Sequence, residues 1–509
     1  MTDGLILAID LGTTGCKATL FDPQGQVAGT AYEEYPIIHP RPDWAEQDPH
    51  TWWQAVCRTV TRLPERSRVI AVSVTSQREG LVPVDASGQP LSNCIIWMDK
   101  RTIVQCETIR QAINERALFG ITGLRLDPAF SLAKLLWIRE HQPEVYARAH
   151  KFLQAGDYLL ARLSGRFASE HSIASRTMLL DIRRRAWSAD LVGRFGISEA
   201  LLPDLFEPGT ALGPLRPSAA AELGLPASAL VVTGGGDQQT NAIGAGAVRS
   251  GSASVGIGTA TAPSVTIDEP IFDPQLRVPC CCAAIPGKWE FEPPLWTTGV
   301  LLRWFRDQFG AGEVDAARAR GVDPYELLTA EAAEAPAGSD GLITLPYFMG
   351  AGAPYWNAHA RGVLFGLSLG HTRAHVIRSL LEAVAYEILL NLEAIEALGW
   401  PLDSLYLTGG GARSALWQEI IADVTGKRVL LPATEGTPSL GAAVLAAVAV
   451  GLYPDVPAAA AAMTRTSREL EPNRARRELY QQYYAVYREA YQGLVPAFRL
   501  LSQVSPTAG

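Results

Sequence analysis

The chain has 509 residues, of which 48% are hydrophobic and 19% are charged, and its formal net charge is −8. A chain of this length exceeds the size of one hydrophobic core, and its composition is that of a folded protein with two or three domains, which excludes a disordered chain. The net negative charge, with Lys and Arg dispersed, excludes a nucleic-acid partner, because phosphate backbones require clustered cations.

Membrane and targeting segments are not expected. The longest apolar stretch, residues 440–452, is rich in alanine and shorter than the ~20 residues that cross a bilayer, so we interpret it as a buried helix. The residues after Met1 lack the basic region of a signal peptide, and seven cysteines do not make a disulfide framework in a chain of this size. Three adjacent cysteines, at 280–282, are expected as apolar filler of a strand. We therefore expect a cytoplasmic protein.

The first half of the chain begins with strands and continues with helices. Runs of apolar and β-branched residues, separated by short turns, predict strands of one sheet at residues 5–10, 18–22, 69–75, 81–85 and 93–97. Apolar residues at helical spacing predict helices at residues 101–113, 131–139 and 158–163. This alternation of strands and helices indicates an α/β architecture.

The second half continues the alternation. A short strand at 230–233 leads into three glycines, Asp237 and a helix of small residues at 238–247. Further along, the pattern predicts a long helix at 376–398, a strand at 405–408, a glycine turn at 409–414, a helix at 415–425 and an aromatic-rich helix at 474–501. A glycine turn between a strand and a helix is a common place for a nucleotide.

Two segments far apart in the chain each combine a strand with a Gly-Thr turn. Residues 6–15 are Ile-Leu-Ala-Ile-Asp-Leu-Gly-Thr-Thr-Gly, and residues 253–261 are Ala-Ser-Val-Gly-Ile-Gly-Thr-Ala-Thr. Glycine lets backbone N–H groups approach phosphate oxygens, and threonine hydroxyls add donors. Either copy alone is an ordinary hairpin turn, but the matched pair predicts a duplicated fold that grips nucleotide phosphates between its halves. Asp10, at the end of the first strand, is the candidate for holding Mg²⁺.

Asp237 is the candidate catalytic base. Three glycines precede it and allow a ligand to approach closely, and Gln238 beside it supplies neutral hydrogen bonds. A carboxylate in this position can accept the proton of a substrate hydroxyl as that hydroxyl attacks phosphorus. The alternative is a structural role, in which Asp237 caps the helix that follows.

Two polar segments are candidates for binding a polyol. Gln77, Arg78 and Glu79 follow a predicted strand, and a guanidinium beside a carboxylate can bracket neighbouring hydroxyls. Trp97 and Asp99 follow a later strand, and an aromatic ring beside polar groups suits the face of a sugar. The alternatives are a surface ion pair for Arg78 and Glu79, and a core position for Trp97.

In this order, the motifs resemble those of the FGGY family of carbohydrate kinases, in the actin-like ATPase superfamily. The resemblance covers nearly the whole chain and is carried by residues 10–14, 236–238, 362–367, 375–382 and 409–414. It implies an α/β fold of two actin-like (ribonuclease H-like) domains with a nucleotide cleft between them. The implied domains are an N-terminal sugar-binding domain, residues 1–244, and a C-terminal nucleotide-binding domain, residues 245–509.

The resemblance also implies roles for individual residues. Asp237 would be the catalytic base and Asp10 the carboxylate associated with Mg²⁺. The sugar would contact Asp237 together with Gln77, Arg78, Glu79, Trp97, Asp99 and Gln238. ATP would be held by residues of both hairpins and of two glycine segments, namely Thr13, Thr14, Lys17, Gly258, Thr259, Gly299, Gly410, Gly411 and Ser414.

The substrate is less closely defined than the reaction. Residues 43–53 and 134–137 are most similar to xylulokinases of the family, but Arg78 and Glu79 stand where xylulokinases have Met-His, and this pair is closer to glycerol kinases. We expect transfer of the γ-phosphate of ATP to a terminal hydroxyl of a small sugar, with D-xylulose, giving D-xylulose 5-phosphate, as the best candidate. Glycerol, a tetritol or another polyol are the alternatives within the family, and a homodimer is left open.

Two other classes of protein share part of this pattern. An actin-like chaperone or filament ATPase shares the nucleotide motifs, but it has no need of Asp237 and Gln238 beside a polar sugar loop. A Rossmann dehydrogenase is excluded, because no Gly-x-Gly-x-x-Gly follows the first strand.

Overall fold

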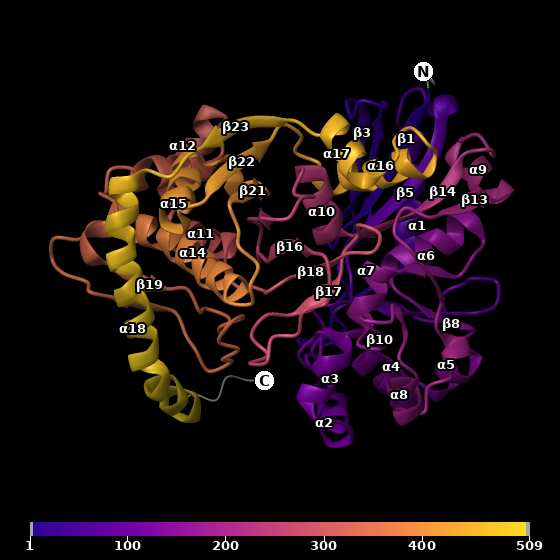
Figure 1. The fold of residues 1–509 in the computed structure, drawn as a ribbon, viewed down its shortest axis with the longest axis horizontal. Helices are drawn as coiled ribbons and strands as arrows, with labels where there is room; N and C mark the ends of the chain where they lie inside the picture. The colour runs from indigo at the N-terminus through magenta and orange to yellow at the C-terminus, as the bar shows by residue number, and fades with distance from the viewer. Residues whose placement is uncertain (1–3, 505–509) are drawn as a thin grey trace. The chain divides into compact units, whose positions relative to one another are not determined.

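The computed structural model describes residues 4–504, which divide into two compact units. Unit 1 comprises the chain up to Arg249 together with Thr266–Glu290 and Gly436–Arg465, and unit 2 comprises Ser250–Val265, Phe291–Glu435 and the chain from Thr466. The expected boundary at 244/245 lies near the end of the first segment of unit 1, and two later segments add to that unit. Figure 1 shows the late segment in yellow beside the indigo N-terminal strands.

Six strands form the central sheet of unit 1. Their order is β13 (Ala211–Pro214), β14 (Leu230–Gly236), β5 (Val69–Ser76), β1 (Leu5–Leu11), β2 (Gly15–Phe21) and β3 (Val27–Glu34). Strands β14, β5 and β1 run parallel, whereas β1, β2 and β3 form an antiparallel meander. The carboxyl ends of the three parallel strands therefore lie at one edge, which is where ligands bind in open α/β sheets.

The helices and short strands of unit 1 surround this sheet. The helices are α1 (Pro49–Thr61), α2 (Ile103–Ala112), α3 (Glu115–Thr122), α4 (Ser131–His141), α5 (Pro143–Arg148), α6 (Ala155–Ser164), α7 (His171–Ala174), α8 (Ala189–Arg194), α9 (Pro217–Leu223), α10 (Asp237–Ala245), α16 (Thr437–Ala449) and α17 (Val456–Met463). The short strands are β4 (Glu46–Gln47), β6 (Val82–Val84), β7 (Cys94–Ile95), β8 (Lys151–Leu153), β9 (Ala168–Glu170), β10 (Leu180–Asp181), β11 (Ala186–Trp187) and β12 (Asp204–Phe206), and the 3₁₀ turns are η1 (Arg66–Arg68), η2 (Ser175–Thr177) and η3 (Glu199–Leu201).

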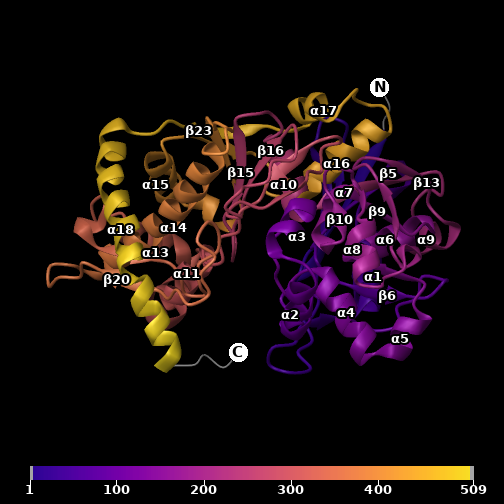
Figure 2. The same ribbon diagram turned by 60° about the horizontal axis from the view of Figure 1, so that its bottom comes forward.

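The two faces of the sheet are covered by different helices, because alternate strand residues point to opposite sides. Leu7 and Ile9 of β1 belong to a cluster that includes apolar residues of α1 and α6. Ile6 and Ala8 of the same strand pack with α16, which is buried as its apolar sequence predicts. Figures 1 and 2 show α16 and α17 over the strands, apart from α1, α6 and α9.

The expectation that residues 81–85 and 93–97 extend the central sheet is wrong. Both segments contain strands, but β6 pairs with β8 and β7 pairs with β4. The chain leaves the sheet after β5 at Glu79, whose φ of 66° lies in the left-handed region. This bend carries the next strands away from the sheet edge, and it forms the loop that bears the candidate sugar-binding residues.

Unit 2 repeats the strand arrangement of unit 1. Its strands belong to a seven-stranded sheet in the order β17 (Cys280–Cys282), β18 (Trp289–Phe291), β16 (Pro263–Ile267), β15 (Ser252–Gly256), β21 (Ser404–Thr408), β22 (Arg428–Pro432) and β23 (Thr466–Leu470). Strand β15 is antiparallel to β16 and parallel to β21, as β1 is antiparallel to β2 and parallel to β5. The duplicated fold expected from the two Gly-Thr segments is therefore present.

Helices cover the sheet of unit 2, and a small hairpin is attached to it. The helices are α11 (Gly299–Phe309), α12 (Ala311–Arg320), α13 (Pro324–Ala332), α14 (Arg373–Glu396), α15 (Ala415–Thr425) and α18 (Arg474–Val504). The hairpin pairs β19 (Ile343–Leu345) with β20 (Val363–Phe365), and η4 (Ser339–Gly341) and η5 (Gly410–Arg413) are 3₁₀ turns. Helix α18 lies against α14, because the hydroxyls of Tyr480 and Tyr484 donate to Glu382 and Glu393 (Figure 2).

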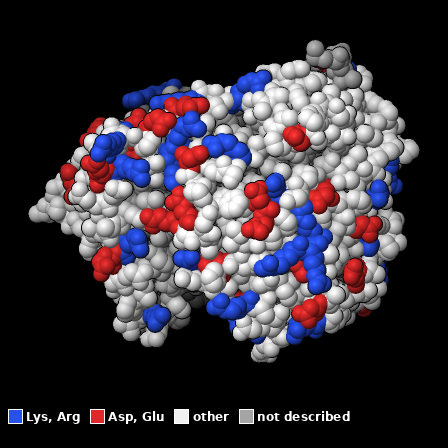
Figure 3. All heavy atoms as spheres, viewed as in Figure 1, with Lys and Arg blue, Asp and Glu red and all other residues white. Residues whose placement is uncertain are grey.

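Two further observations concern the surface charge and the length of the helices. On the face drawn in Figure 3, basic and acidic side chains are interspersed among neutral ones. Between residues 4 and 504, none of the helices is both long and apolar enough to cross a lipid bilayer.

Candidate active site

Three of the predicted site segments follow the parallel strands of unit 1. Asp10 lies near the end of β1, Gln77 to Glu79 follow β5, and Asp237 follows β14. The strand register pairs Asp10 with Thr75, and Thr75 with Gly235, so the three strands end side by side. The fold thus brings together residues that are far apart in the sequence.

Asp10 and Asp237 form a pair of like charges. Burial, and then the negative charge of Asp237, raises the pKa of Asp10 to about 7, whereas the Lys17 ammonium opposes this shift. Lys17 lies opposite Asp10 in the β1–β2 register. Two neighbouring carboxylates supply the oxygen ligands that Mg²⁺ prefers, so Asp10 and Asp237 could hold this cation.

Asp237 is the first residue of α10 and follows the three glycines of β14. Its N-cap is Gly236, and one carboxylate oxygen accepts a hydrogen bond of 2.8 Å from the N–H of Gln238. A methyl group on Gly236 would lie 2.3 Å from Cδ of Arg78, and one on Gly234 would lie 2.0 Å from the carbonyl oxygen of Val74. The glycines therefore make room for β5 and for Arg78, and 31% of the Asp237 side chain remains exposed to a ligand.

The Arg78–Glu79 pair lies between two further charged groups. Nε of Arg78 is 3.6 Å from Oδ1 of Asp237 and 4.0 Å from Oε1 of Glu79, and Nε of Arg176 is 2.6 Å from the same Glu79 oxygen. Arg78, Glu79 and Arg176 are each at least 87% buried, so this is not a surface ion pair. Alternating charges run from Asp237 through Arg78 and Glu79 to Arg176.

Gln77 and Trp97 meet at the turn between β1 and β2. Nε1 of Trp97 donates to the hydroxyl of Thr13 at 3.0 Å, and that hydroxyl donates to Oε1 of Gln77 at 3.3 Å. The Thr13 carbonyl accepts from Nε2 of Gln47 at 2.6 Å. Thr13, predicted to contact phosphate, thus lies against two residues predicted to contact the sugar, while Thr14 is exposed.

Asp99 and Gln238 differ in their surroundings. Asp99 is fully buried, and its oxygens accept from the backbone N–H of Ala45 at 2.6 Å and from Nε of Arg101 at 2.9 Å. These contacts fix the loop that carries Trp97, whereas Gln238 is half-buried beside Asp237. The predicted contacts of both residues with a sugar stay predictions.

The nucleotide-binding candidates of unit 2 also come together. The N–H of Gly299 donates to the carbonyl of Gly258 at 2.8 Å, and the N–H of Gly411 donates to the carbonyl of Ile257 at 3.1 Å. A methyl group on Gly299 would lie 2.4 Å from that Gly258 oxygen, so this close approach requires glycine. Thr259 and Gly410 are exposed beside them, whereas the Ser414 hydroxyl caps α15 by accepting from the N–H of Trp417.

Several residues at the site were not predicted from the sequence. Arg176 lies in η2, almost 100 residues after Glu79 in the chain, and Gln47 lies in the short strand β4. Lys134 belongs to the segment that is similar to xylulokinases, and Ser131 begins a predicted helix, but the sequence predicts no role at the site for either residue. None of these residues sits in a local pattern that points to a ligand.

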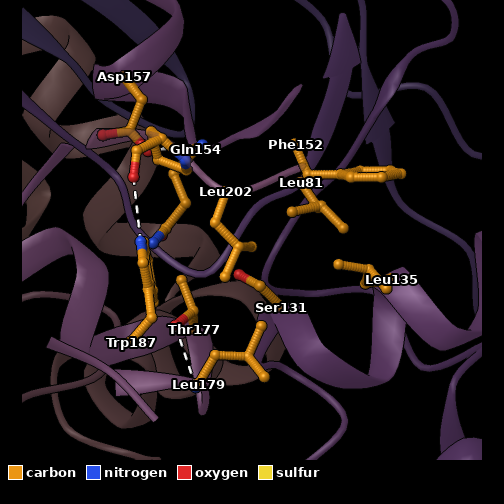
Figure 4. Close-up of a pocket in the computed structure, with 11 residues that line it drawn as sticks. Leu81, Ser131, Leu135, Phe152, Gln154, Asp157, Thr177, Leu179, Trp187 and Leu202 are labelled. Carbon is orange, nitrogen blue, oxygen red and sulfur yellow. Dashed lines mark hydrogen bonds between the residues drawn. The ribbon is translucent and has the colours of Figure 1, made fainter. Parts of the chain in front are cut away.

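A small cavity lies on the far side of the Glu79 loop. Figure 4 shows its lining, which is mostly apolar, with Ser131, Gln154, Asp157 and Thr177 as polar members. Burial raises the pKa of Asp157 to about 7, and this carboxylate accepts from the N–H of Gln154 at 2.9 Å. The predicted site residues are not among those that line this cavity.

Comparisons with known proteins agree with this geometry. Residues 5–244 match the model of the N-terminal domain of the FGGY family of carbohydrate kinases, and residues 253–450 match that of the C-terminal domain. The chain belongs to the FGGY family of carbohydrate kinases and is a sugar kinase.

Individual relatives differ in their named substrates. The chain is 31% identical to a xylulose kinase of Escherichia coli (strain K12), over 97% of this chain and 99% of that protein. It is 32% identical to a gluconokinase of Bacillus subtilis (strain 168), over 88% of each chain. The solved structure of a xylulose kinase from Rhodospirillum rubrum is 30% identical and superposes with a TM-score of 0.89, over 97% of this chain and all of that one.

Proposed function

We propose that this sugar kinase transfers the γ-phosphate of ATP to a terminal hydroxyl of D-xylulose, giving D-xylulose 5-phosphate. The observation that carries the proposal is the position of Asp237. It is a partly exposed carboxylate at the carboxyl end of β14, and its ion pair with Arg78 continues into the buried charges of Glu79 and Arg176. A base at the edge of a polar, donor-rich loop suits a polyhydroxy substrate.

In the proposed reaction, Asp237 accepts the proton of the attacking hydroxyl. The substrate oxygen then forms a bond to the γ-phosphorus, and the bond between that phosphorus and the bridging oxygen of ADP breaks. Thr13, Thr14 and Lys17 in unit 1, and the glycine segments of unit 2, are proposed to hold the nucleotide. Mg²⁺, when bound, neutralises phosphate charge, and Asp10 with Asp237 would hold it.

The charge balance of the loop favours a neutral substrate. The guanidinium of Arg78 faces Asp237, and the guanidinium of Arg176 faces Glu79, so each of these cations has a carboxylate partner. Gluconate carries a carboxylate that must itself be paired with a cation, because burying an unpaired charge is costly. A neutral ketose or polyol meets no such requirement, and its hydroxyls can both donate to Glu79 and accept from Arg78.

Glycerol, or another linear polyol, is the second candidate. The observation in its favour is the Arg78–Glu79 pair itself, which replaces Met-His of xylulokinases and resembles glycerol kinases.

The seven cysteines are free thiols, which supports the proposed cytoplasmic location.

A substrate panel tests the proposal. ADP release would be measured with D-xylulose, D-ribulose, glycerol, erythritol, gluconate and aldoses, each over a range of concentrations. We expect kcat/KM to be highest for D-xylulose and ADP release without an added sugar to be low. Higher kcat/KM for glycerol or erythritol would select the second candidate, and a preference for gluconate would overturn the charge argument. ADP release at the same rate with and without every sugar of the panel would show that none of them is the substrate, and it would overturn the proposal for D-xylulose and glycerol alike.

A further inference from the structure

The backbone of Glu79 adopts a conformation that needs support. Its φ is 66°, in the left-handed region, which a residue with a Cβ atom rarely occupies because the conformation is strained. The surroundings of a residue in this conformation must therefore hold it there.

Three buried side chains bind both backbone polar groups of Glu79. Oε1 of Gln154 accepts from its N–H at 2.6 Å, the hydroxyl of Ser131 donates to its carbonyl at 3.1 Å, and Nζ of Lys134 donates to the same carbonyl at 2.8 Å. The Gln154 amide is itself fixed, because its Nε2 donates to the carbonyl of Ile173 at 2.6 Å. Figure 4 shows Ser131 and Gln154 among the residues that line the cavity near this loop.

Lys134 is the unusual member of this set. Its side chain lies within α4 with 0% exposure, and its ammonium also donates to the carbonyl of Ala129. Burial lowers the pKa of Lys134 to about 8, and the Glu79 carboxylate opposes this shift. A buried lysine is costly, and its direct contact is the carbonyl of the residue that carries the proposed sugar-binding carboxylate.

We propose that Lys134 is a positioning residue, which holds Glu79 in the left-handed conformation and so aims its carboxylate at the sugar. The inference rests on the proposed function, in which Glu79 contacts the sugar. The Lys134 ammonium binds the carbonyl of Glu79, and the Gln154 side chain binds its N–H. Together they fix the peptide groups on both sides of the Glu79 Cα atom. The Glu79 side chain can then lie between Arg78 and Arg176.

Lys134→Met keeps the length of the side chain and removes the hydrogen bonds. We expect it to raise the KM for the sugar about 10- to 100-fold, which is the range for losing a hydrogen bond to a charged group, with the KM for ATP unchanged. Leu135→Ala is the matched control, because this neighbour on α4 lines the cavity but does not bind Glu79. The control should lower the melting temperature and leave both KM values unchanged.

A double-mutant cycle separates positioning from general damage. Glu79→Gly favours the left-handed backbone without support and removes the carboxylate. If Lys134 acts through Glu79, then Lys134→Met raises the sugar KM in the native background but adds nothing in the Glu79→Gly background. Equal effects in both backgrounds would overturn the proposal.

The same cycle distinguishes this inference from the proposed function. If Glu79→Gly alone leaves the sugar KM unchanged, then Glu79 does not contact the sugar, and the proposed function of the loop fails. If Glu79→Gly raises the KM but Lys134→Met does not, then the loop binds the sugar and the role of Lys134 is wrong. Should Lys134→Met not fold, Ser131→Ala removes the other hydrogen bond to the same carbonyl and should raise the sugar KM by a smaller factor.

Discussion

The Asp237 side chain forms an ion pair with Arg78 and is also partly exposed. Arg78 approaches one of its oxygens at 3.6 Å, and Asp10 is close enough for the two carboxylates to affect one another. Burial and this like charge raise the pKa of Asp10 to about 7, so a proton or a cation at this pair is favoured. The Asp237 side chain is 31% exposed, so its carboxylate is the group that a substrate hydroxyl can reach.

Asp237→Asn keeps the shape of the side chain and removes its basicity. We expect kcat to fall ~10²- to 10⁴-fold, the usual cost of losing a general base, while ATP affinity changes little. Steady-state kinetics and calorimetric titration with a non-hydrolysable ATP analogue would measure both. Asp85→Asn, in an exposed turn, is the control. More than a tenth of native turnover in Asp237→Asn would reject the assignment of the base.

Thr259 tests the nucleotide side of the proposal. Its side chain is exposed beside Gly258 and Gly299, and valine has nearly the same shape without the hydroxyl. Thr259→Val should weaken ATP binding by roughly 1.5–3 kcal/mol, the range for a hydrogen bond to a charged group, and leave the sugar KM unchanged. Titration with the ATP analogue measures the loss. A change confined to the sugar KM would show that this turn does not bind phosphate.

At the scale of elements, unit 1 depends on a close crossing of α10 and α16. A methyl group on Gly441 would lie 1.9 Å from the carbonyl oxygen of Thr240, and one on Gly244 would lie 1.9 Å from that of Thr437. These reciprocal glycines let the two helix backbones approach. Because α10 begins with Asp237, this crossing also fixes the proposed base.

Gly441→Ala should therefore destabilise the protein although alanine favours helices. Overpacking of this kind costs about 1–3 kcal/mol. Gly193→Ala, in α8, is the matched control, because a methyl group there meets no atom within 4 Å and should leave stability unchanged or slightly higher. Urea unfolding would compare the two variants with the native protein. Equal midpoints for Gly441→Ala and the control would contradict the close crossing.

In unit 2, helix α18 docks through tyrosines on buried carboxylates of α14. In α18, the hydroxyl of Tyr487 donates to Oε1 of Glu387 and that of Tyr480 donates to Glu382 at 2.8 Å. Tyr347, which follows β19, also donates to Oε1 of Glu387. Burial raises the pKa of Glu387 to about 7 from the 4.5 of an exposed glutamate. The folded protein therefore keeps a proton on Glu387 at pH values at which the unfolded chain has lost it.

Because Glu387 keeps its proton in the folded protein, we can predict how the free energy of unfolding changes with pH. The stability that Glu387 contributes in its protonated form is complete below pH ~4.5 and is lost as pH rises towards 7, about 3 kcal/mol in all. Glu387→Gln stays neutral and still accepts from both tyrosines, so its stability relative to the native protein should rise between pH 5 and 7. Urea unfolding at both pH values measures this difference. Parallel curves for the two proteins would mean that Glu387 carries no proton in the fold.

The sequence predicted helices better than it predicted sheet membership. The stripe at 376–398 lies within two or three residues of α14 (Arg373–Glu396), and 415–425 matches α15, because one buried face imposes a period of 3.6. Strands β6 and β7 were placed in the wrong sheet, because a strand pattern does not identify its partner. Arg176 and Gln154 were missed for the same reason, since they reach Glu79 only through the tertiary fold.

At the scale of the whole molecule, the two ligands should protect different parts of the chain. All proposed sugar contacts lie in unit 1, whereas proposed nucleotide contacts lie in both units. Hydrogen exchange should slow at residues 77–80 and 171–177 with the sugar alone. With the ATP analogue and Mg²⁺ it should slow at 12–17, 256–261 and 409–414. Nucleotide protection confined to unit 1 would remove unit 2 from the proposed binding site.

The discontinuous make-up of unit 1 has a consequence for its synthesis. Helix α16 covers Ile6, Ala8 and Val232, yet it belongs to a segment that begins at Gly436, whereas the first segment of the unit ends at Arg249. At about 5–20 residues per second, a ribosome needs roughly 10–40 s to make the chain between them. Throughout that interval the first segment lacks α16, whose apolar residues pack on this face of the sheet. The half of the enzyme proposed to bind the sugar is thus translated first and completed late, and we expect its uncovered apolar face to make the nascent chain prone to aggregation until α16 is made.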